Sequence, residues 1–361
     1  MPFNVSLLGS TGEAYTVASV VQLSSAAILI LILILSVILS SLWSRNELSK
    51  PIKLDRRNLP RISIILPTWN EEKVIAAKLD DVESQDYPDD LLEVIIIDSA
   101  SSDSTVSIVR NWISEKGFEL GKKYKIIQED SRKGKSYSIN RAFSEADDES
   151  EILMMSDVDC RLAQGVLLMI ANRFGDESIG AITGRQILLN LDQNRKSAQE
   201  GSYRDFFSRM RIAESRFSST PIFHGECAAY RRRAISNHKL VENSNADDSQ
   251  MAINSRRNGF RAIMDHEITF TEPINHHRPL YRKIRRAQGL SRTFWKNRDM
   301  CYLPMEKFSW IFRSNFYFHI LFPWLFMLSF SIMAASSIAD NYRDAEISIN
   351  IFDIFIISSI L

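Results

Sequence analysis

Four short apolar runs, the first three each followed by a helical pattern, constrain the fold of this chain more than any other feature. The runs are ISIILP (62–67), EVIIID (93–98), YKIIQ (124–128) and EILMMSD (151–157). They are apolar nearly throughout, as strands buried on both faces of a sheet are. After the second run, Val106, Val109 and Ile113 recur at helical spacing behind residues that suit a helix N-cap. The alternation predicts an α/β domain, with a mostly parallel sheet and helices on both faces.

Polar residues follow each of these runs. They are PTWNEE after the first, Asp98 at the end of the second, RKGK after the third, and Asp157 with Asp159 after the fourth. An open parallel sheet binds ligands beyond the carboxyl ends of its strands, so these residues are expected to share one crevice. Two carboxylates one position apart repel each other unless a cation lies between them. Mg²⁺ suits the pair because it takes one or two carboxylates and completes its shell with phosphate oxygens. A turn with two solvated acids is the simpler alternative, and four polar strand ends at one edge favour the metal site.

Overall charge and cysteine content exclude several classes of protein. The 44 basic residues balance the 44 acidic ones, which argues against nucleic acid as a partner bound through bulk charge. Cys160, Cys227 and Cys301 lie far apart with no paired spacing. We therefore expect reduced thiols, with neither a disulfide framework nor a zinc site.

Two long uncharged stretches predict membrane-crossing helices. They lie within Ala14–Ser44 and Ser314–Ala339, and each exceeds the ~20 residues that a crossing needs. Basic residues follow the first stretch and precede the second, whereas residues 1–44 contain none. By the positive-inside rule this predicts an integral protein of the cell membrane with the intervening domain in the cytoplasm.

The chain then divides as follows. Residues 1–17 form a non-cytoplasmic N-terminus, 18–43 a transmembrane helix, 44–60 a basic linker and 61–275 one soluble domain of ordinary size. Residues 276–313 mix aromatic with basic side chains, which predicts amphipathic helices at the membrane surface. Residues 314–339 form a second transmembrane helix. The apolar stretch 347–361 is short and carries Asp353, and the sequence leaves open whether it crosses the membrane.

Seven motifs now give a resemblance to a known family. In order they are LPTWNEE, IIDSASSDST, GKSYSIN, SDVD, HGECAAYRR, ADDSQMAINSRRNGF and RRAQG. In this order and spacing the chain, from about Arg61 to Gly289, resembles the membrane-bound family 2 glycosyltransferases. That resemblance implies the Rossmann-like GT-A fold and an inverting enzyme that uses a nucleotide sugar.

The resemblance also implies roles for individual residues. Donor nucleotide binding falls to Pro67, Thr68, Asn70, Glu71, Asp98, Lys135 and Asp157. Where the family often has Asp-Asp-Gly-Ser, this chain has Asp98, Ser99, Ala100 and Ser101. One carboxylate is missing from the turn that reads the base, so uridine and guanosine both stay open.

The family's D-x-D motif matches Asp157 and Asp159, which implies that they hold Mg²⁺ or Mn²⁺ on the donor diphosphate. The metal is needed because it neutralises charge on the departing oxygen. Asp247 and Asp248 match an acidic pair, and Asp248 is implied as the base that deprotonates the acceptor hydroxyl. His224, Gly225 and Glu226, together with Asp247, are implied to line the side of the donor sugar and the acceptor.

Arginines replace a further family motif. Processive synthases carry Q-x-x-R-W here, and this chain has Arg282, Arg285 and Arg286, without the glutamine and the tryptophan. Guanidinium groups suit a diphosphate, but the missing tryptophan predicts single transfer. The predicted acceptor is lipid-linked: a polyprenyl-phosphate-based glycan or a glycolipid presented at the bilayer. Three alternatives stay open: a processive polysaccharide synthase of the cellulose, chitin or hyaluronan type, a polyprenyl-phosphate glycosyl synthase, and an inactive scaffold that binds nucleotide sugar.

Overall fold

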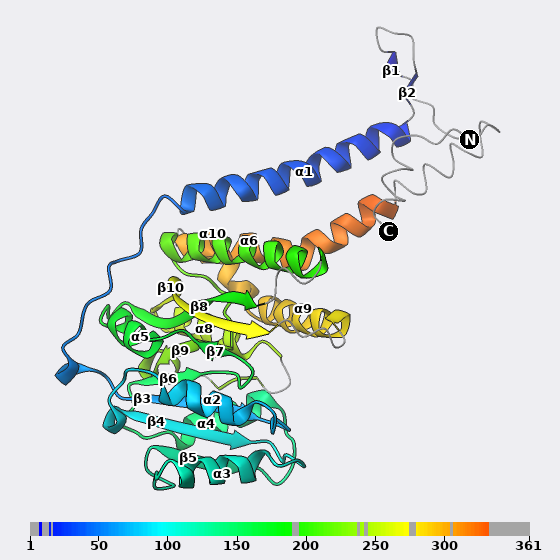
Figure 1. Cartoon of the computed structure of the whole chain (residues 1–361). Helices are drawn as coiled ribbons and strands as arrows, with labels where there is room; N and C mark the ends of the chain where they lie inside the picture. Colours follow the sequence, from blue (N-terminus) through cyan, green and yellow to red (C-terminus); the bar gives the residue numbers. More distant parts are fainter. Residues whose placement is uncertain are drawn as a thin grey trace. The chain divides into compact units, whose positions relative to one another are not determined.

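The computed structural model describes residues 7–8, 14–15, 17–189, 195–236, 239–241, 245–273, 279–303 and 306–331. The chain divides into two compact units. One consists of Met1–Leu39 and Ser314–Leu361, and the other of Ser40–Arg313. The second unit contains every residue of the candidate site, and Figure 1 labels its strands and helices.

One eight-stranded sheet forms the centre of the second unit, in the order β5-β4-β3-β6-β9-β8-β10-β7. The strands are β3 (Ile62–Thr68), β4 (Leu92–Asp98), β5 (Tyr124–Gln128), β6 (Ile152–Met155), β7 (Arg161–Leu162), β8 (Ile179–Leu189), β9 (Ala228–Arg231) and β10 (Arg261–Pro273). The predicted parallel pairing of the first four runs is confirmed, since β5, β4, β3 and β6 pair in parallel.

The other half of the sheet is mixed, which the prediction of a mostly parallel sheet did not include. Strand β9 is antiparallel to both β6 and β8, β10 is parallel to β8, and β7 is antiparallel to β10. Because β8 and β10 therefore run in the same direction as β6, their carboxyl ends lie at the same edge as those of β3 to β6. The amino end of β9 lies at that edge too. The mixed topology therefore brings all these strand ends to one edge of the sheet.

Helices cover both faces of this sheet, as predicted. They are α2 (Ile75–Glu83), α3 (Thr105–Glu115), α4 (Lys135–Glu145), α5 (Val166–Phe174), α6 (Arg195–Phe217), α7 (Arg232–Ile235), α8 (Asp247–Arg257) and α9 (Pro279–Lys296). Alternate residues of β3 enter different cores: Ile64 packs with side chains of α2, α3 and α5, and Ile65 with side chains of α4 and α8. This two-sided burial explains why the strand sequences are apolar without alternation.

The remaining elements are short or belong to the first unit. The second unit also has 3₁₀ turns at Arg56–Asn58, Asp89–Leu91 and Arg298–Tyr302. In the first unit are β1 (Leu7–Leu8), β2 (Ala14–Tyr15) and most of α1 (Val17–Trp43). Helix α10 (Lys307–Phe316) is followed by a π-helical turn, Tyr317–Leu321.

The predicted integral-membrane localisation, with a cytoplasmic catalytic domain, is wrong. Within the described ranges, no helix combines the length and the apolarity needed to cross a bilayer. This contradicts the transmembrane helices predicted over 18–43 and 314–339. The second stretch contains the π-helical turn and is described only to Ser331. The segment 347–361 lies outside the described residues.

Candidate functional site

The ends of β3 and β4 form the first part of the site. Thr68, next to Pro67 at the end of β3, donates through its hydroxyl to Asp98 Oδ1 at 3.2 Å. The backbone N–H and the hydroxyl of Ser101 donate to the same carboxylate, at 3.0 and 2.5 Å. Asp98 is only 2% exposed, and these bonds compensate for its burial.

Asn70 joins the loops that follow the two strands. Its backbone N–H donates to Ser101 Oγ at 2.9 Å, and its Oδ1 accepts from the Ser102 N–H at 2.8 Å. Asn70 and Ala100 both have left-handed backbone conformations, with φ of 56° and 57°. Asparagine tolerates this conformation, whereas alanine is strained in it. These hydrogen bonds therefore hold the two predicted nucleotide-binding loops together as one surface.

The D-x-D pair follows β6 and faces the start of α4. Lys135, the first residue of α4, lies with its Nζ 2.5 Å from Asp157 Oδ1. Burial alone would lower the pKa of Lys135, but Asp157, Asp247 and Glu226 together raise it above its usual value. Lys135 is therefore cationic at neutral pH and lies among carboxylates from both halves of the sheet.

Negative charge accumulates around Asp157 and Asp159. Burial, then Asp157 and Glu226, raise the pKa of Asp159 above its usual value. Burial, then Asp159 and Asp157, raise the pKa of Glu71 to about 7. Such a set of mutually repelling carboxylate oxygens fits a hard divalent cation such as Mg²⁺ or Mn²⁺.

The carboxylates of the D-x-D pair are two in number. Over the described residues, no three histidine, cysteine or acidic side chains are placed to hold a metal ion among themselves. Mg²⁺ in phosphate-transferring sites takes one or two carboxylates and fills the rest of its shell from phosphate and water. Asp157 and Asp159 supply that number of ligands.

A buried lysine that the sequence did not indicate contacts the backbone of the loop that carries the D-x-D pair. Lys78 of α2 is fully buried, and its Nζ donates to the Cys160 carbonyl at 3.2 Å and to Asp81 at 3.0 Å. Asp81 in turn accepts from the Leu162 N–H at 3.1 Å. This pair fixes the backbone directly after Asp159. In the sequence, the signal for this residue was its position on the apolar side of a helix.

Asp247 and Asp248 begin α8 on the other side of the site. The hydroxyl of Ser136 donates to Asp247 Oδ1, and the backbone N–H of Ser249 donates to Asp248 Oδ1 at 2.8 Å. Burial, followed by Glu226, raises the pKa of Asp248 to about 7. A carboxyl that ionises near neutral pH is matched to the work of a general base.

Gly225 lies between the two halves of the site. A Cβ at this position would lie 3.7 Å from Lys135 Nζ and 3.8 Å from Asp248 Oδ2. The segment HGE immediately precedes β9, whose amino end lies at the crevice edge. The structure therefore brings Lys135 and Asp248, far apart in sequence, to the same small residue.

His224 and Glu226 connect this centre to two arginines. Arg211 Nη1 lies 2.9 Å from His224 Nε2, and Arg286 Nη2 lies 3.5 Å from Glu226 Oε1. Burial and then Arg211 lower the pKa of His224 well below its usual value, so the ring is neutral. A guanidinium only donates, so Nε2 must accept and the ring proton lies on Nδ1. That nitrogen is 3.9 Å from Glu226 Oε2.

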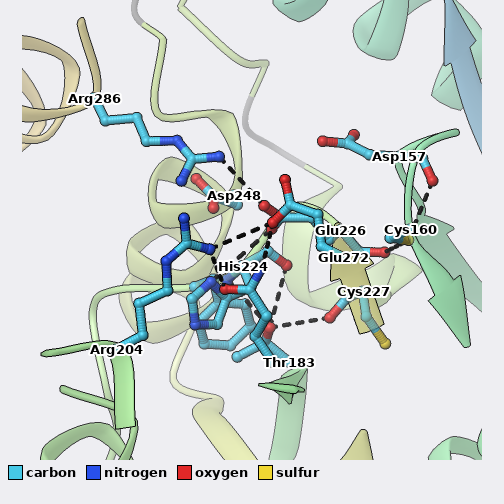
Figure 2. Close-up of polar contacts among 12 residues, drawn as sticks. Asp157, Cys160, Thr183, Arg204, His224, Glu226, Cys227, Asp248, Glu272 and Arg286 are labelled. Carbon is cyan, nitrogen blue, oxygen red and sulfur yellow. Dashed lines mark hydrogen bonds and ion pairs between the residues drawn. The ribbon is translucent and has the colours of Figure 1, made fainter. Parts of the chain in front are cut away.

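A second group, not found by sequence, extends the crevice along β8 and β10. Gln186 Nε2 donates to Glu272 Oε2, and Arg204 Nη1 donates to Gln186 Oε1 at 2.7 Å. Burial, then Glu226, raise the pKa of Glu272 to about 7. Figure 2 shows Glu272 beside Glu226, with Arg204 and Arg286 around them. The sequence signal for Gln186 and Glu272 was a polar side chain near the end of a strand. The same criterion located the residues that follow β3 to β6.

The three predicted arginines of α9 remain, and the structure describes the side chains of two of them. Arg285 is close enough to Asp247 to lower that residue's pKa in part, against the raising effect of burial. The backbone of Arg282 belongs to α9, and its side chain lies outside the described part of the structure. Arg286 contacts a predicted site residue directly, since its Nη2 lies 3.5 Å from Glu226 Oε1.

Comparison with known proteins identifies the family. The sequence profile described as "Glycosyl transferase family 2" matches residues 63–238. The solved structure of the mannosyltransferase PcManGT from Pyrobaculum calidifontis, in complex with GDP-Man and Mn²⁺, is 30% identical with a TM-score of 0.77. The alignment covers 90% of this chain and 88% of that one. The chain belongs to glycosyltransferase family 2.

Curated members of the family match over shorter regions. A beta-monoglucosyldiacylglycerol synthase of Trichormus variabilis is 32% identical over 142 residues, which are 38% of this chain and 28% of that protein. A dolichyl N-acetyl-alpha-D-glucosaminyl phosphate 3-beta-D-2,3-diacetamido-2,3-dideoxy-beta-D-glucuronosyltransferase of Methanococcus voltae is 35% identical over 92 residues, 26% of this chain and 27% of that one. This family 2 chain thus spans less than a third of the length of either relative.

Proposed function

We propose that this family 2 member transfers a single sugar, with inversion, from a UDP- or GDP-sugar to a hydroxyl of a lipid-linked acceptor. The observation that carries the proposal is the meeting of Lys135 and Asp248 on either side of Gly225. A cationic group beside the D-x-D pair stabilises the departing diphosphate, and a base with a pKa near 7 is suited to take the proton of the attacking hydroxyl.

The donor binds along the carboxyl ends of β3 to β6. The nucleotide contacts Pro67, Thr68, Asn70, Glu71, Asp98, Lys135 and Asp157. Asp157 and Asp159 hold Mg²⁺ or Mn²⁺, which, when bound, neutralises charge on the departing diphosphate. Lys135 and Arg286, with Arg282 and Arg285 nearby in α9, add positive charge on that side.

The base acts from the opposite side. Asp248 accepts the proton of the acceptor hydroxyl, whose oxygen attacks the anomeric carbon from the face opposite the diphosphate. Gly225 leaves space for the sugar to approach the base closely, because any side chain there would lie against Asp248. His224, Glu226 and Asp247 line this side.

GDP-mannose is the first donor to test, because the structural relative at 30% identity was solved with GDP-Man and Mn²⁺. For the acceptor, the names of the two curated relatives contain diacylglycerol and a dolichyl-linked sugar phosphate. Both are lipids, which supports an acceptor presented from a membrane.

Nucleotide release tests the proposal. Protein is incubated with a panel of UDP- and GDP-sugars, with Mg²⁺ or Mn²⁺ and a membrane-lipid extract. We expect release from one donor to depend on metal, on the extract and on Asp159, so that Asp159→Asn is inactive. Asp148→Asn, the same substitution at an exposed aspartate outside the site, is the matched control. Equal release by Asp159→Asn, or no release and no binding of any donor, would refute the proposal.

A further inference from the structure

Helix α9 exposes large apolar side chains that the proposed reaction does not use. Leu280, Tyr281 and Ile284 are 69%, 64% and 46% exposed, and Trp295 is 56% exposed. Residues three, four or eleven positions apart share one side of an α-helix, so these four side chains form a stripe along a single side of α9. Single exposed apolar residues are ordinary in proteins, whereas an apolar patch with a polar rim marks a surface that binds a partner.

The stripe lies on the side of α9 that does not pack against the protein. Thr293, nine positions after Ile284 and therefore opposite it, is 3% exposed. Phe294 is fully buried, and its ring centroid lies 5.1 Å from that of Phe312 in α10. A surface helix of a globular protein normally turns its apolar side to the core. In α9 a second apolar side faces away from the core of the second unit.

Cations border the stripe on both edges. The helix has six basic residues and no acidic one. Consecutive residues point about 100° apart, so Lys283 and Arg285 lie on opposite sides of Ile284. Arg292 and Lys296, seven and eleven positions after Arg285, continue its edge, and all four cationic side chains are exposed. Such a helix can lie at a bilayer surface, with its apolar side toward the acyl chains and its cations among the headgroups.

Charge and apolarity together select one partner for this surface. A second copy of the chain, bound through the same helix in a two-fold contact, would place two sets of six like charges against each other. A nucleic acid would contact the cations and leave the apolar stripe in water. A bilayer with anionic lipids satisfies both features, because its headgroups attract the cations and its acyl boundary takes up the apolar side chains.

We propose that α9 binds the surface of a bilayer that contains anionic lipids, with Leu280, Ile284 and Trp295 at the boundary between headgroups and acyl chains. The helix lies on the surface and does not cross it. Arg286 of the same helix contacts Glu226 of the crevice at 3.5 Å, so this binding holds the crevice next to the lipids. The inference goes beyond the proposed reaction, since the surface binds lipid with or without a sugar donor.

A fluorescent label on the stripe tests this contact in the full chain. Gln288 is exposed and lies four positions after Ile284, on the same side of α9. The native cysteines are buried, so Gln288→Cys can be labelled selectively with the fluorophore NBD. The probes are vesicles of phosphatidylcholine alone, and vesicles of phosphatidylcholine and phosphatidylglycerol in equal parts. We expect NBD emission to rise and shift to the blue with the anionic vesicles, and nitroxide groups on the acyl chains to quench it. A label at Asp148→Cys, exposed elsewhere on the second unit, should do neither.

Paired charge substitutions in the labelled protein test the cations. Arg292→Gln combined with Lys296→Gln should weaken vesicle binding about fivefold for each cation removed, and added salt should weaken binding of the unsubstituted protein. Lys116→Gln combined with Lys122→Gln removes two exposed cations from another part of the second unit and should leave binding unchanged. Equal melting temperatures show that the loss is not caused by unfolding.

A further pair of substitutions tests the apolar stripe. Ile284→Ser should weaken vesicle binding about tenfold, because it removes apolar area from the bilayer contact. Leu120→Ser, at a leucine that is 45% exposed elsewhere on the unit, should not change it.

Four results would overturn the proposal. The first is an unchanged label at position 288 with anionic vesicles, even if the chain sediments with them through another surface. The second is an equal response to neutral vesicles. The third is the same response to the soluble polyanion heparin, and the fourth is a response that depends on protein concentration alone, as a second copy would give. The assay contains no nucleotide sugar, so failure of the proposed transfer reaction leaves its result unaffected.

Discussion

Replacing Asp248 with asparagine should stabilise the protein while abolishing transfer to a hydroxyl. The carboxyl is buried, and its pKa is raised from 3.8 to about 7. At 1.36 kcal/mol per pKa unit, this difference corresponds to about 4 kcal/mol of destabilisation once the group is ionised in the folded state. Asparagine has nearly the same shape, is never charged, and keeps an Oδ1 that can accept from the Ser249 N–H.

The sign follows from proton binding. Between pH 4 and pH 7 the folded protein holds the Asp248 proton and the unfolded chain does not, so stability falls as pH rises through this window. Above pH 7 the full cost is present, and below pH 4 it is absent. The new amide N–H₂ must find a partner, which costs about 1–2 kcal/mol if it is left unpaired, so a net gain of roughly 2–3 kcal/mol is expected at pH 8.

Urea unfolding of the metal-free protein at pH 8 and at pH 5 measures this effect. Asp248→Asn should exceed wild type in stability at pH 8 and lose most of the advantage at pH 5, while its transfer activity falls by about 10²–10⁴-fold. Asp148→Asn, at an exposed carboxylate, should change neither quantity. If Asp248→Asn is less stable than wild type at pH 8, or if its gain in stability is the same at both pH values, ionisation of Asp248 does not destabilise the folded protein.

Three further predictions concern the donor side. Lys78→Met should lower the free energy of unfolding by about 3–5 kcal/mol, because it leaves Asp81 buried without its cation, and a gain in urea resistance would contradict this. Ala100→Gly should stabilise the protein by about 0.5–1 kcal/mol, because glycine adopts a φ of 57° without strain but costs entropy in the unfolded chain. Donor affinity in that variant should stay within about twofold, since no side-chain contact is lost. Mn²⁺ should raise Tm in the wild type by mass action, more so with GDP present, and should not do so in Asp159→Asn. An equal rise in both proteins would place the metal elsewhere.

The first half of the fold could be predicted from sequence because its signals are local. Strands β3 to β6 are short, mostly apolar runs, and the next element after each of β3, β4 and β5 is a helix, so periodicity and order suffice. Strand β9 gives no such signal: it is the four-residue segment AAYR, and its antiparallel direction depends on pairing with β6 and β8. The uncharged stretches near both ends led to the prediction of transmembrane helices, and no helix of the described residues meets the length and apolarity that a crossing needs.

The residues of the site, like the strands, divide into those that the sequence predicts and those that only the structure brings together. Asp157, Asp159 and Asp248 lie in short motifs that can be read one at a time, and the structure brings them to one crevice. Gln186 and Glu272 are 86 residues apart, and each is an ordinary polar residue in its own segment. Only the parallel pairing of β8 with β10 makes them neighbours, so their contact could not be predicted without the second half of the sheet.

The mixed sheet brings two sets of strand ends to the same edge. Strands β3 to β6 carry the residues proposed to bind the donor at their carboxyl ends, while β8 and β10 carry Gln186 and Glu272 at theirs. Between them, the reversed strand β9 begins at the crevice edge, which places Gly225 and Glu226 where the two halves meet. Changes at the ends of β3 and β4 should therefore alter the donor KM and leave the acceptor KM unchanged. Changes at Gly225 or Glu226 should alter both, because these residues face Lys135 on one side and Asp248 or Arg286 on the other. A Glu226→Gln enzyme that changes only one of the two KM values would show that the halves of the crevice act separately.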